Sequence, residues 1–199
     1  MGIFDFLKRK EKSQTEIEQI KCNELGEYSL TFLNFTEKNH ISKVLENPII
    51  SSEFEKEFAH LIVGKPMKKG EIISIKYYSA FINIWEQIVE VIFDDNNEDL
   101  TKFVEKVNPQ LNWLSKNRDY INENIIQNLL KLKNEVWLNE NELNKNNTEF
   151  LKPISLKSIN CNKNLGLNLN FDDGDLFNGH SIKVNINSKR EIKKVSIVG

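Results

Sequence analysis

The residue types that could do chemistry gather in one short segment, residues 171–180. It reads Phe-Asp-Asp-Gly-Asp-Leu-Phe-Asn-Gly-His and holds three carboxylates, two glycines and one of the chain's three histidines. Folding this segment back on itself would bring His180 near Asp172 or Asp173. Carboxylates and an imidazole held together can bind a metal ion or transfer protons. One interpretation is therefore a catalytic or metal site that uses Asp173, Asp175 and His180.

The same segment also has the composition of a tight turn between two strands. Gly174 can adopt a positive φ, and aspartate side chains accept hydrogen bonds from nearby backbone N–H groups. We expect Leu176 and Phe177 to pack beneath the sheet, and His180 to bond a carboxylate or a carbonyl. Because a turn accounts for these residues without a ligand, we expect no catalytic residue, no bound metal and no cofactor.

Other catalytic and metal-binding sequence patterns are missing from the chain. A calcium loop counted from Asn168 has Asp173 where glycine is needed and Gly179 where glutamate is needed. The sequence contains no Gly-x-Ser-x-Gly, Cys-x-x-Cys or Walker A pattern. The other two histidines, His40 and His60, lack the spacing of a ligand cluster. These patterns argue against an enzyme.

A second group of carboxylates lies in residues 94–99, which read Asp-Asp-Asn-Asn-Glu-Asp. As a contact surface they would attract a basic protein partner, because opposite charges steer association. The alternative is a solvated loop that leads into a helix, with Asn97 or Asp99 as the N-cap. The four acidic residues of this run are Asp94, Asp95, Glu98 and Asp99.

The composition is that of a globular protein whose charges are divided along the chain. The 199 residues include 27 basic and 29 acidic side chains, a net charge of −2 that disfavours nucleic-acid binding. The net charge is −6 over residues 1–99 and +4 over residues 151–199. An acidic first half would suit a basic partner. Asparagine makes up 27 of the 199 residues, which we attribute to codon usage in an AT-rich genome.

The first twelve residues indicate no export signal and, at most, a weak membrane contact. Their apolar residues precede the basic ones, and Phe6 stands where myristoylation needs Ser or Thr. A short amphipathic segment over residues 1–12 could rest on an anionic membrane surface or pack on the protein's own core. No apolar run is long enough to span a bilayer. Since Cys22 and Cys161 are far apart, we expect a cytoplasmic protein with free thiols.

Hydrophobic periodicity predicts the elements that must position these groups. Helical spacing indicates helices over residues 15–25, 51–63, 100–107 and 120–138, with Pro109 interrupting the third. Alternation indicates strands over residues 28–35, 73–77, 89–93, 165–171, 182–186 and 195–197, and around Leu156. Three tryptophans fall in strands or helices and are expected in the core: Trp85, Trp113 and Trp137.

Together these elements predict an α+β fold with an antiparallel sheet, a central helical segment and a C-terminal β-meander. The loop at residues 64–70 holds a proline between two glycines and marks a boundary. We expect residues 1–70 to form a helix and strand extension that packs on the main domain. Residues 71–199 would form the α+β domain.

The C-terminal part of the chain resembles a bacterial family, domain of unknown function 2262. The resemblance covers about residues 72–199 and implies a shared fold unit without implying an activity. Asn178 stands where that family usually has an aromatic residue, which would weaken a binding surface built on that aromatic. The matching residues are Asp173–Phe177, Gly179, His180, Ile182, Val184, Ile197, Gly199 and the helix end Asn134–Leu138.

Two classes of function follow from these observations. The first is a non-catalytic cytosolic protein that binds another protein, most concretely an immunity protein that neutralises a cognate basic toxin by covering it. Its contacts would come from the acidic run and from the turn residues Asp173, Asp175, Phe177 and His180. The alternative is an enzyme, dependent on a metal or a small ligand, that uses the turn at residues 173–180.

Overall fold

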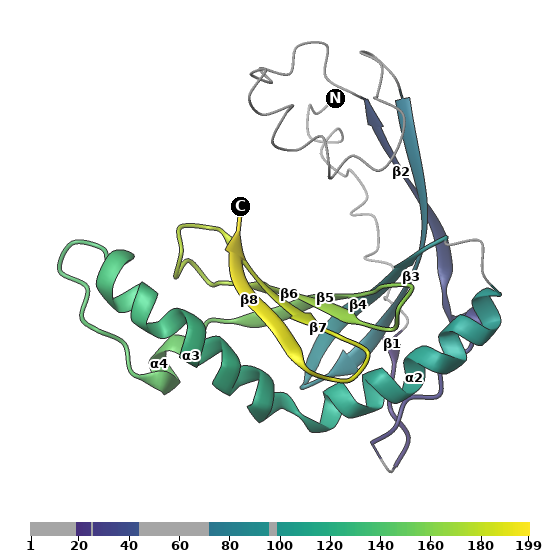
Figure 1. The fold of residues 1–199 in the computed structure, drawn as a ribbon, viewed down its shortest axis with the longest axis horizontal. Helices are drawn as coiled ribbons and strands as arrows, with labels where there is room; N and C mark the ends of the chain where they lie inside the picture. Colours follow the sequence, from purple (N-terminus) through teal and green to yellow (C-terminus); the bar gives the residue numbers. More distant parts are fainter. Residues whose placement is uncertain (1–18, 25, 44–71, 96–98) are drawn as a thin grey trace, which may run out of the picture.

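Among the residues that the computed structural model describes, eight strands form one sheet and the helices lie across one of its faces (Figure 1). The structure describes residues 19–24, 26–43, 72–95 and 99–199. The strands are β1 (Gln19–Ile20), β2 (Thr36–Lys43), β3 (Ile72–Ile84), β4 (Gln87–Asp94), β5 (Ser155–Cys161), β6 (Leu167–Asp172), β7 (Ser181–Ile186) and β8 (Ile192–Val198). The helices are the 3-10 turn η1 (Phe32–Asn34), α2 (Leu100–Lys116), α3 (Arg118–Val136) and α4 (Asn147–Leu151).

The strand order is β1-β3-β4-β5-β6-β7-β8, and β2 also pairs with β3. Strands β5 to β8 are joined by successive antiparallel pairings, which confirms the predicted meander. The expectation of an antiparallel sheet is wrong at two places, because β1 pairs parallel with β3 and β4 pairs parallel with β5. The chain crosses the sheet through α2, α3 and α4 after β4, so β5 starts again from the end at which β4 started. The fold is α+β with a mostly antiparallel sheet.

The core lies between the helices and the face of the sheet that they cover. Alternate strand residues point into it, so that β3 buries Ile82 and Ile84 and β4 buries Val89 and Val91. On β5 and β6 the opposite face carries polar residues. Asn170 donates to Ser158 there over 2.9 Å. One face of the sheet is therefore sealed by helices, and on β5 and β6 the other face is lined by amides and hydroxyls.

The central helical segment follows the predicted periodicity with one difference. Helix α3 buries Ile121, Ile125 and Leu129, which recur every fourth residue, as predicted. Pro109 does not interrupt α2, which runs continuously from Leu100 to Lys116. Pro109 is exposed, so the Glu105 carbonyl that loses its helical donor also lies on the solvent side. A proline on the solvent-facing side of a helix can be accommodated, because water replaces the missing bond.

The predicted strand over residues 28–35 is wrong, although its alternation is correct. Tyr28 and Leu30 are buried while Ser29 is exposed, yet this stretch joins no strand and ends in the turn η1. Its backbone groups bond to side chains of α2 instead of to a neighbouring strand: Asn112 accepts from the Tyr28 N–H over 2.6 Å. Because these bonds use side chains remote in sequence, periodicity alone reads the segment as a strand.

Other N-terminal predictions meet the structure only in part. The helix expected over residues 15–25 is wrong at Gln19–Ile20, which form β1 beside β3. The helix over 51–63, the boundary loop over 64–70 and the segment 1–12 lie outside the described residues. Strands β1 and β2 extend the same sheet as the C-terminal meander.

The three tryptophans are partly buried and pack against the core, but two of them lie outside regular elements. Trp85 and Glu86 form the two-residue turn between β3 and β4, with φ values of 54° and 65°. Trp137 caps the end of α3. The Trp85 indole N–H donates to the Ser115 carbonyl over 3.1 Å, which ties this hairpin to α2.

Candidate functional site

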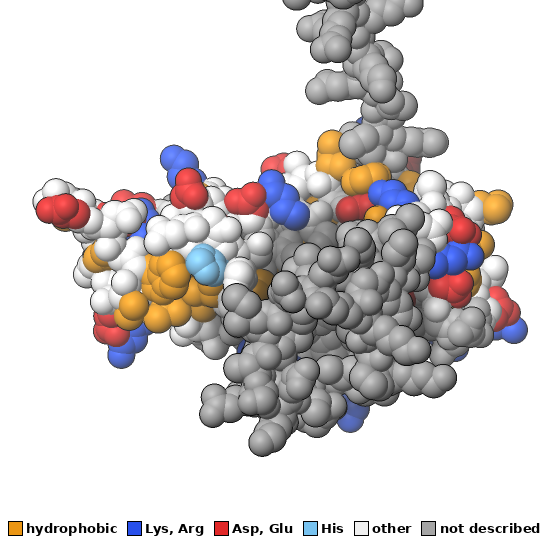
Figure 2. All heavy atoms as spheres, turned by 90° about the horizontal axis from the view of Figure 1, so that it is seen from above, with side chains coloured by type: hydrophobic (Ala, Val, Ile, Leu, Met, Phe, Trp, Pro, Cys, Tyr) orange, Lys and Arg blue, Asp and Glu red, His pale blue; other side chains and the backbone are white. Residues whose placement is uncertain are grey.

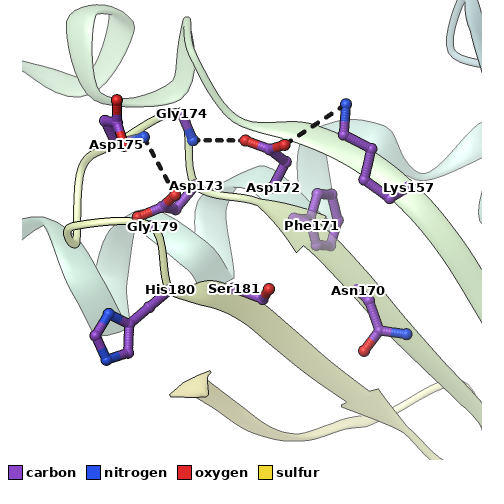
Figure 3. A pocket seen from close by; sticks show the side chains of 10 residues that line it. All are labelled: Lys157, Asn170, Phe171, Asp172, Asp173, Gly174, Asp175, Gly179, His180 and Ser181. Carbon is purple, nitrogen blue, oxygen red and sulfur yellow. Dashed lines mark hydrogen bonds and ion pairs between the residues drawn. The ribbon is translucent and has the colours of Figure 1, made fainter. Parts of the chain in front are cut away.

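The segment that joins β6 to β7 forms a compact turn beside an open pocket of about 360 Å³ (Figure 3). Asp172 pairs with Ser181 where the two strands end. Lys157 on β5 and Asn170 on β6 line the pocket together with the turn. The structure thus brings Asp173, Asp175 and His180, the three residues of the catalytic interpretation, to the rim of one hollow.

Two of the three carboxylates are used inside the turn. Asp173 is only 3% exposed, and it accepts hydrogen bonds from the backbone N–H of Asp175 at 3.1 Å and of Phe177 at 2.6 Å. Asp172 accepts from the Gly174 N–H at 2.9 Å and lies 3.7 Å from the Lys157 Nζ. The exposed Asp175 side chain points away from them (Figure 3). The local sequence folds this way because aspartate caps consecutive N–H groups.

Four residues of the turn have left-handed backbone conformations. Gly174 has φ of 58° and packs so closely on Pro153 that an added Cβ would lie 2.7 Å from the Pro153 carbonyl oxygen. Asp175 and Asn178 have φ values of 67° and 55°. Asparagine tolerates this region better than an aromatic does. The asparagine at position 178 therefore suits its backbone.

His180 is held by contacts that leave its ring half-buried. Its Nδ1 lies 2.6 Å from the Phe177 carbonyl oxygen, which accepts the ring proton in that tautomer. Trp137 meets the imidazole edge to face at a centroid distance of 5.4 Å. Gly199 lies against the other edge, where an added Cβ would come within 2.4 Å of the ring. The histidine fills a slot between the end of α3 and the end of the chain.

Phe177 lies directly below this slot and is fully buried. Its ring packs edge to face against Trp137 at 5.7 Å and against Phe150 at 6.3 Å. Leu176 beside it is also buried, as predicted. Any contribution of Phe177 to a binding surface is therefore made through the residues that it supports.

The chemistry open to this arrangement is limited by these bonds. Both oxygens of Asp173 already accept backbone protons, and the His180 Nδ1 faces a carbonyl. Within the described ranges, no three His, Cys, Asp or Glu side chains lie close enough to hold a metal ion together. The groups that face solvent are the exposed Asp172 and Asp175, the Lys157 amine and the half-buried His180.

The acidic run lies at the other end of the strands. Asp94 ends β4 and is exposed, and Asp95 lies 3.6 Å from the Lys76 amine. Asp99 caps α2 by accepting from the Lys102 N–H, which confirms one of the two predicted caps. Hydrogen bonds from the Lys102 side chain and backbone hold the pKa of Asp99 below its ordinary value. Glu98 lies outside the described residues.

The two predicted groups of carboxylates therefore do not form one site. Asp172 pairs with Ser155 at the start of β5, which runs parallel to β4, whereas Asp94 stands at the end of β4. At the rise of a β-strand, the eight residues of β4 separate the two groups by about 20 Å. A single small ligand cannot touch both.

A surface that sequence reasoning missed surrounds His180. Val136 is 68% exposed, and it is followed by Trp137, which contacts the imidazole. Figure 2 shows hydrophobic side chains gathered beside a histidine on this face. We name Val136, Trp137 and His180 the His180 patch. Val136 and Trp137 lie at the end of α3 and His180 lies just before β7, so no local sequence pattern indicates the patch.

A buried lysine supports this patch from below. Lys133 is 1% exposed, and its Nζ donates to the Trp137 carbonyl at 2.7 Å and to Glu142 at 2.8 Å. Glu142 also accepts the Asn139 N–H at 2.9 Å and pairs with Lys145. The sequence gives little indication of this ion pair, because Lys133 and Glu142 are nine residues apart and only the fold brings them together.

The fold and the turn define a class of α+β protein in which helices seal one sheet face and an Asp-Gly-Asp turn joins two strands of the C-terminal meander. Residues 58–197 match the family described as an uncharacterized protein conserved in bacteria (DUF2262), and the chain belongs to that family. The resemblance predicted over about residues 72–199 is thereby confirmed. No curated protein and no solved structure matches the chain. Among the described helices, none has the length and apolar character needed to cross a membrane.

Proposed function

We propose that this chain is a non-catalytic bacterial protein that works in the cytoplasm by binding another protein through the His180 patch. The observation that carries the proposal is the exposure of apolar side chains around a half-buried tryptophan. Val136 is 68% exposed at the end of α3, and Trp137, which follows it, packs edge to face against His180. Tryptophan at the centre of an exposed apolar patch is typical of the residues that dominate protein interfaces.

The rigidity of the patch also supports this role. Trp137 is held through its carbonyl by buried Lys133, and its ring packs on fully buried Phe177. Little conformational entropy would be lost when such a surface meets a partner. The turn carboxylates then have a positioning role: Asp173 fixes the backbone that carries Phe177 and, three residues later, His180.

The specific form of the proposal is an immunity protein that covers a cognate toxin. The net charge of −6 over residues 1–99 would steer a basic toxin towards this chain. Asp94, Asp95, Glu98 and Asp99 would contribute to that steering, although Lys76 and Lys102 offset part of the charge of Asp95 and Asp99. Steering of this kind raises the association rate more than the affinity.

Co-expression with the product of the neighbouring gene tests this proposal. The wild-type chain should bind that product and relieve its toxicity. Val136→Lys should weaken binding at least about tenfold with an unchanged thermal midpoint, because it places a charge in the apolar contact. Ile88→Lys is the matched control, because Ile88 is also an exposed apolar residue, at 48%, but lies on β4 away from the patch. Unrelieved toxicity, or equal loss in both variants, would contradict the proposal.

A second candidate is the metal- or ligand-dependent enzyme that uses Asp173, Asp175 and His180. The observation in its favour is that these residues line one pocket of about 360 Å³. Calorimetric titration with Zn²⁺ or Mn²⁺ distinguishes the two candidates. Saturable binding that is lost in a stably folded His180→Ala variant would favour the enzyme. A titration without saturable heat, or a His180→Ala variant that mainly loses stability, would favour the binding protein.

A further inference from the structure

Helix α2 carries a row of polar side chains that bind the extended segment at residues 27–30. Asn108, Asn112 and Lys116 recur every fourth residue and so share one side of the helix. Asn112 accepts from the Tyr28 N–H at 2.6 Å and donates to the Tyr28 carbonyl at 3.2 Å. Asn108 does the same for Leu30, with both distances at 2.9 Å.

Two side-chain amides therefore bind the main chain of this segment at two points. Each asparagine pairs with both backbone groups of one residue, as a neighbouring strand would, and skips the residue between them. Ser29 is accordingly exposed, while Tyr28 and Leu30 are 3% and 2% exposed. The Tyr28 hydroxyl donates to the Asn83 carbonyl on β3 at 2.5 Å. The surface therefore holds an extended backbone whose two buried side chains lie two residues apart.

An ion pair adds a third element of recognition. Lys116, one helical turn beyond Asn112, lies 3.1 Å from Glu27. The segment that α2 contacts thus has an acidic residue, Glu27, then the aromatic Tyr28, the exposed Ser29 and the aliphatic Leu30. Lys116 and Glu27 are about half exposed, so this pair contributes selectivity more than affinity.

The segment read by α2 comes from outside the part of the chain that defines the family. The family match begins at residue 58, whereas the segment lies at residues 27–30. All the reading residues, Asn83, Asn108, Asn112 and Lys116, lie within the matched region. The receiving surface therefore lies within the family match, and the segment that occupies it lies outside that match.

We propose that the surface formed by Asn108, Asn112, Lys116 and the Asn83 carbonyl is a peptide-binding groove, which residues 27–30 occupy in cis. Its external ligand is an extended peptide with an acidic residue, an aromatic residue and, two positions later, an aliphatic residue. The tethered segment has an effective concentration in the millimolar range, so it outcompetes a dilute external peptide until it is displaced. The groove and the His180 patch are built from different residues, so the failure of one leaves the other intact.

A synthetic peptide of residues 26–36, labelled with a fluorophore, tests the groove by anisotropy against the full-length chain. A Tyr28→Ala, Leu30→Ala host weakens the occupant held in cis. This host should bind the peptide at least about tenfold more tightly than the wild-type chain does. Adding Asn108→Ala and Asn112→Ala to the host should abolish that gain while the helix is retained, because alanine favours helix.

The peptide itself provides the matched control. A peptide with Ser29→Ala and Thr31→Ala changes only exposed positions and should bind equally well, while one with Tyr28→Ala and Leu30→Ala should not bind. Should the host prove unfolded, the intact peptide must restore its cooperative thermal transition. Equal binding to host and wild type, binding that ignores Asn108 and Asn112, or an unfolded host that the peptide does not restore would each overturn the proposal.

Discussion

Asp173 has a carboxylate that could take part in catalysis, but its oxygens are occupied by hydrogen bonds from backbone N–H groups. Its carboxylate is 3% exposed and accepts two N–H groups, from Asp175 and Phe177. A buried carboxylate with both oxygens bonded in this way stabilises the loop that it caps. Reactivity at the turn would then depend on the exposed Asp175 and on His180.

We expect Asp173→Ala to lower the free energy of unfolding by about 2 kcal/mol, because the buried Phe177 N–H and the partly buried Asp175 N–H both lose their acceptor. Urea denaturation measures the change. Asp175→Asn is the control, since it removes an exposed charge and keeps a residue that tolerates positive φ; it should stay within about 0.5 kcal/mol of wild type. Equal effects of the two variants would contradict the capping role of Asp173.

The two glycines of the turn give a matched pair of substitutions. Both have positive φ, 58° at Gly174 and 79° at Gly179, so alanine pays a similar backbone cost of about 1 kcal/mol at each. Only at Gly174 would the new Cβ meet backbone, at 2.7 Å from the Pro153 oxygen. Gly174→Ala should therefore destabilise the chain by about 1–3 kcal/mol more than Gly179→Ala does. Thermal denaturation that ranks them equally would contradict the packing at Pro153.

At the scale of elements, the loop between α3 and α4 is ordered by charge. Glu142 accepts the Asn139 N–H and bonds Lys133 and Lys145. The Asn139 N–H, followed by the two lysines, lowers the pKa of Glu142 from 4.5 to about 2. The ionised carboxylate is thus favoured in the folded chain, and it anchors the loop that follows Trp137.

This pKa predicts how the stability of the chain depends on pH. Because the folded pKa lies below the unfolded value of 4.5, the stabilisation by Glu142 is complete above about pH 4.5 and is lost as the pH falls towards 2. Denaturation midpoints of wild type and Glu142→Gln should therefore differ near neutral pH and converge in acid. Glu135→Gln, which alters an exposed pair with Lys131 at 3.7 Å, is the control and should show little difference at any pH. A gap that widens in acid would contradict the assignment.

Elements whose apolar residues repeat regularly could be predicted from the sequence. Helix α3 and the strands β5 to β8 lie close to the predicted ranges, because Ile121, Ile125 and Leu129 or alternate residues such as Ile182 and Val184 mark their buried faces. The stretch at Tyr28 and Leu30 has the same alternation but forms no strand, because Asn108 and Asn112 take the place of a pairing strand. We attribute the many asparagines to codon usage, but at these two positions their amides hold the backbone of another segment.

At the scale of the whole molecule, the sheet joins segments that are far apart in the chain. Strand β5 pairs with β4 across the helical crossover, and it buries Cys161 at its end. Cys22 near the N-terminus is exposed, while burial raises the pKa of Cys161 to about 12. Reaction of Cys22 therefore needs no unfolding, whereas reaction of Cys161 requires the sheet to open.

We expect a thiol reagent to label Cys22 rapidly in the native chain and Cys161 only when the sheet opens. Opening of a central strand costs most of the global stability, so labelling of Cys161 should be at least about a thousandfold slower. A Cys22→Ser variant isolates the slow reaction, and mass spectrometry follows it. Denaturant should accelerate labelling of Cys161 in step with global unfolding. Rapid labelling of both thiols in the native chain would contradict the burial of β5.

The sequence by itself determined the local features of this protein: the periodicity of α3 and the meander, an N-cap at either Asn97 or Asp99, and a turn at residues 171–180 rich in Asp and Gly. These depend on interactions between residues close in the chain, which composition and spacing reveal. Only the tertiary structure decided that β5 lies parallel to β4, that Trp137 covers His180, and that Asn108 and Asn112 hold Tyr28 and Leu30. Amide groups and apolar side chains pair with many partners equally well, so folding alone selects which distant residues they meet.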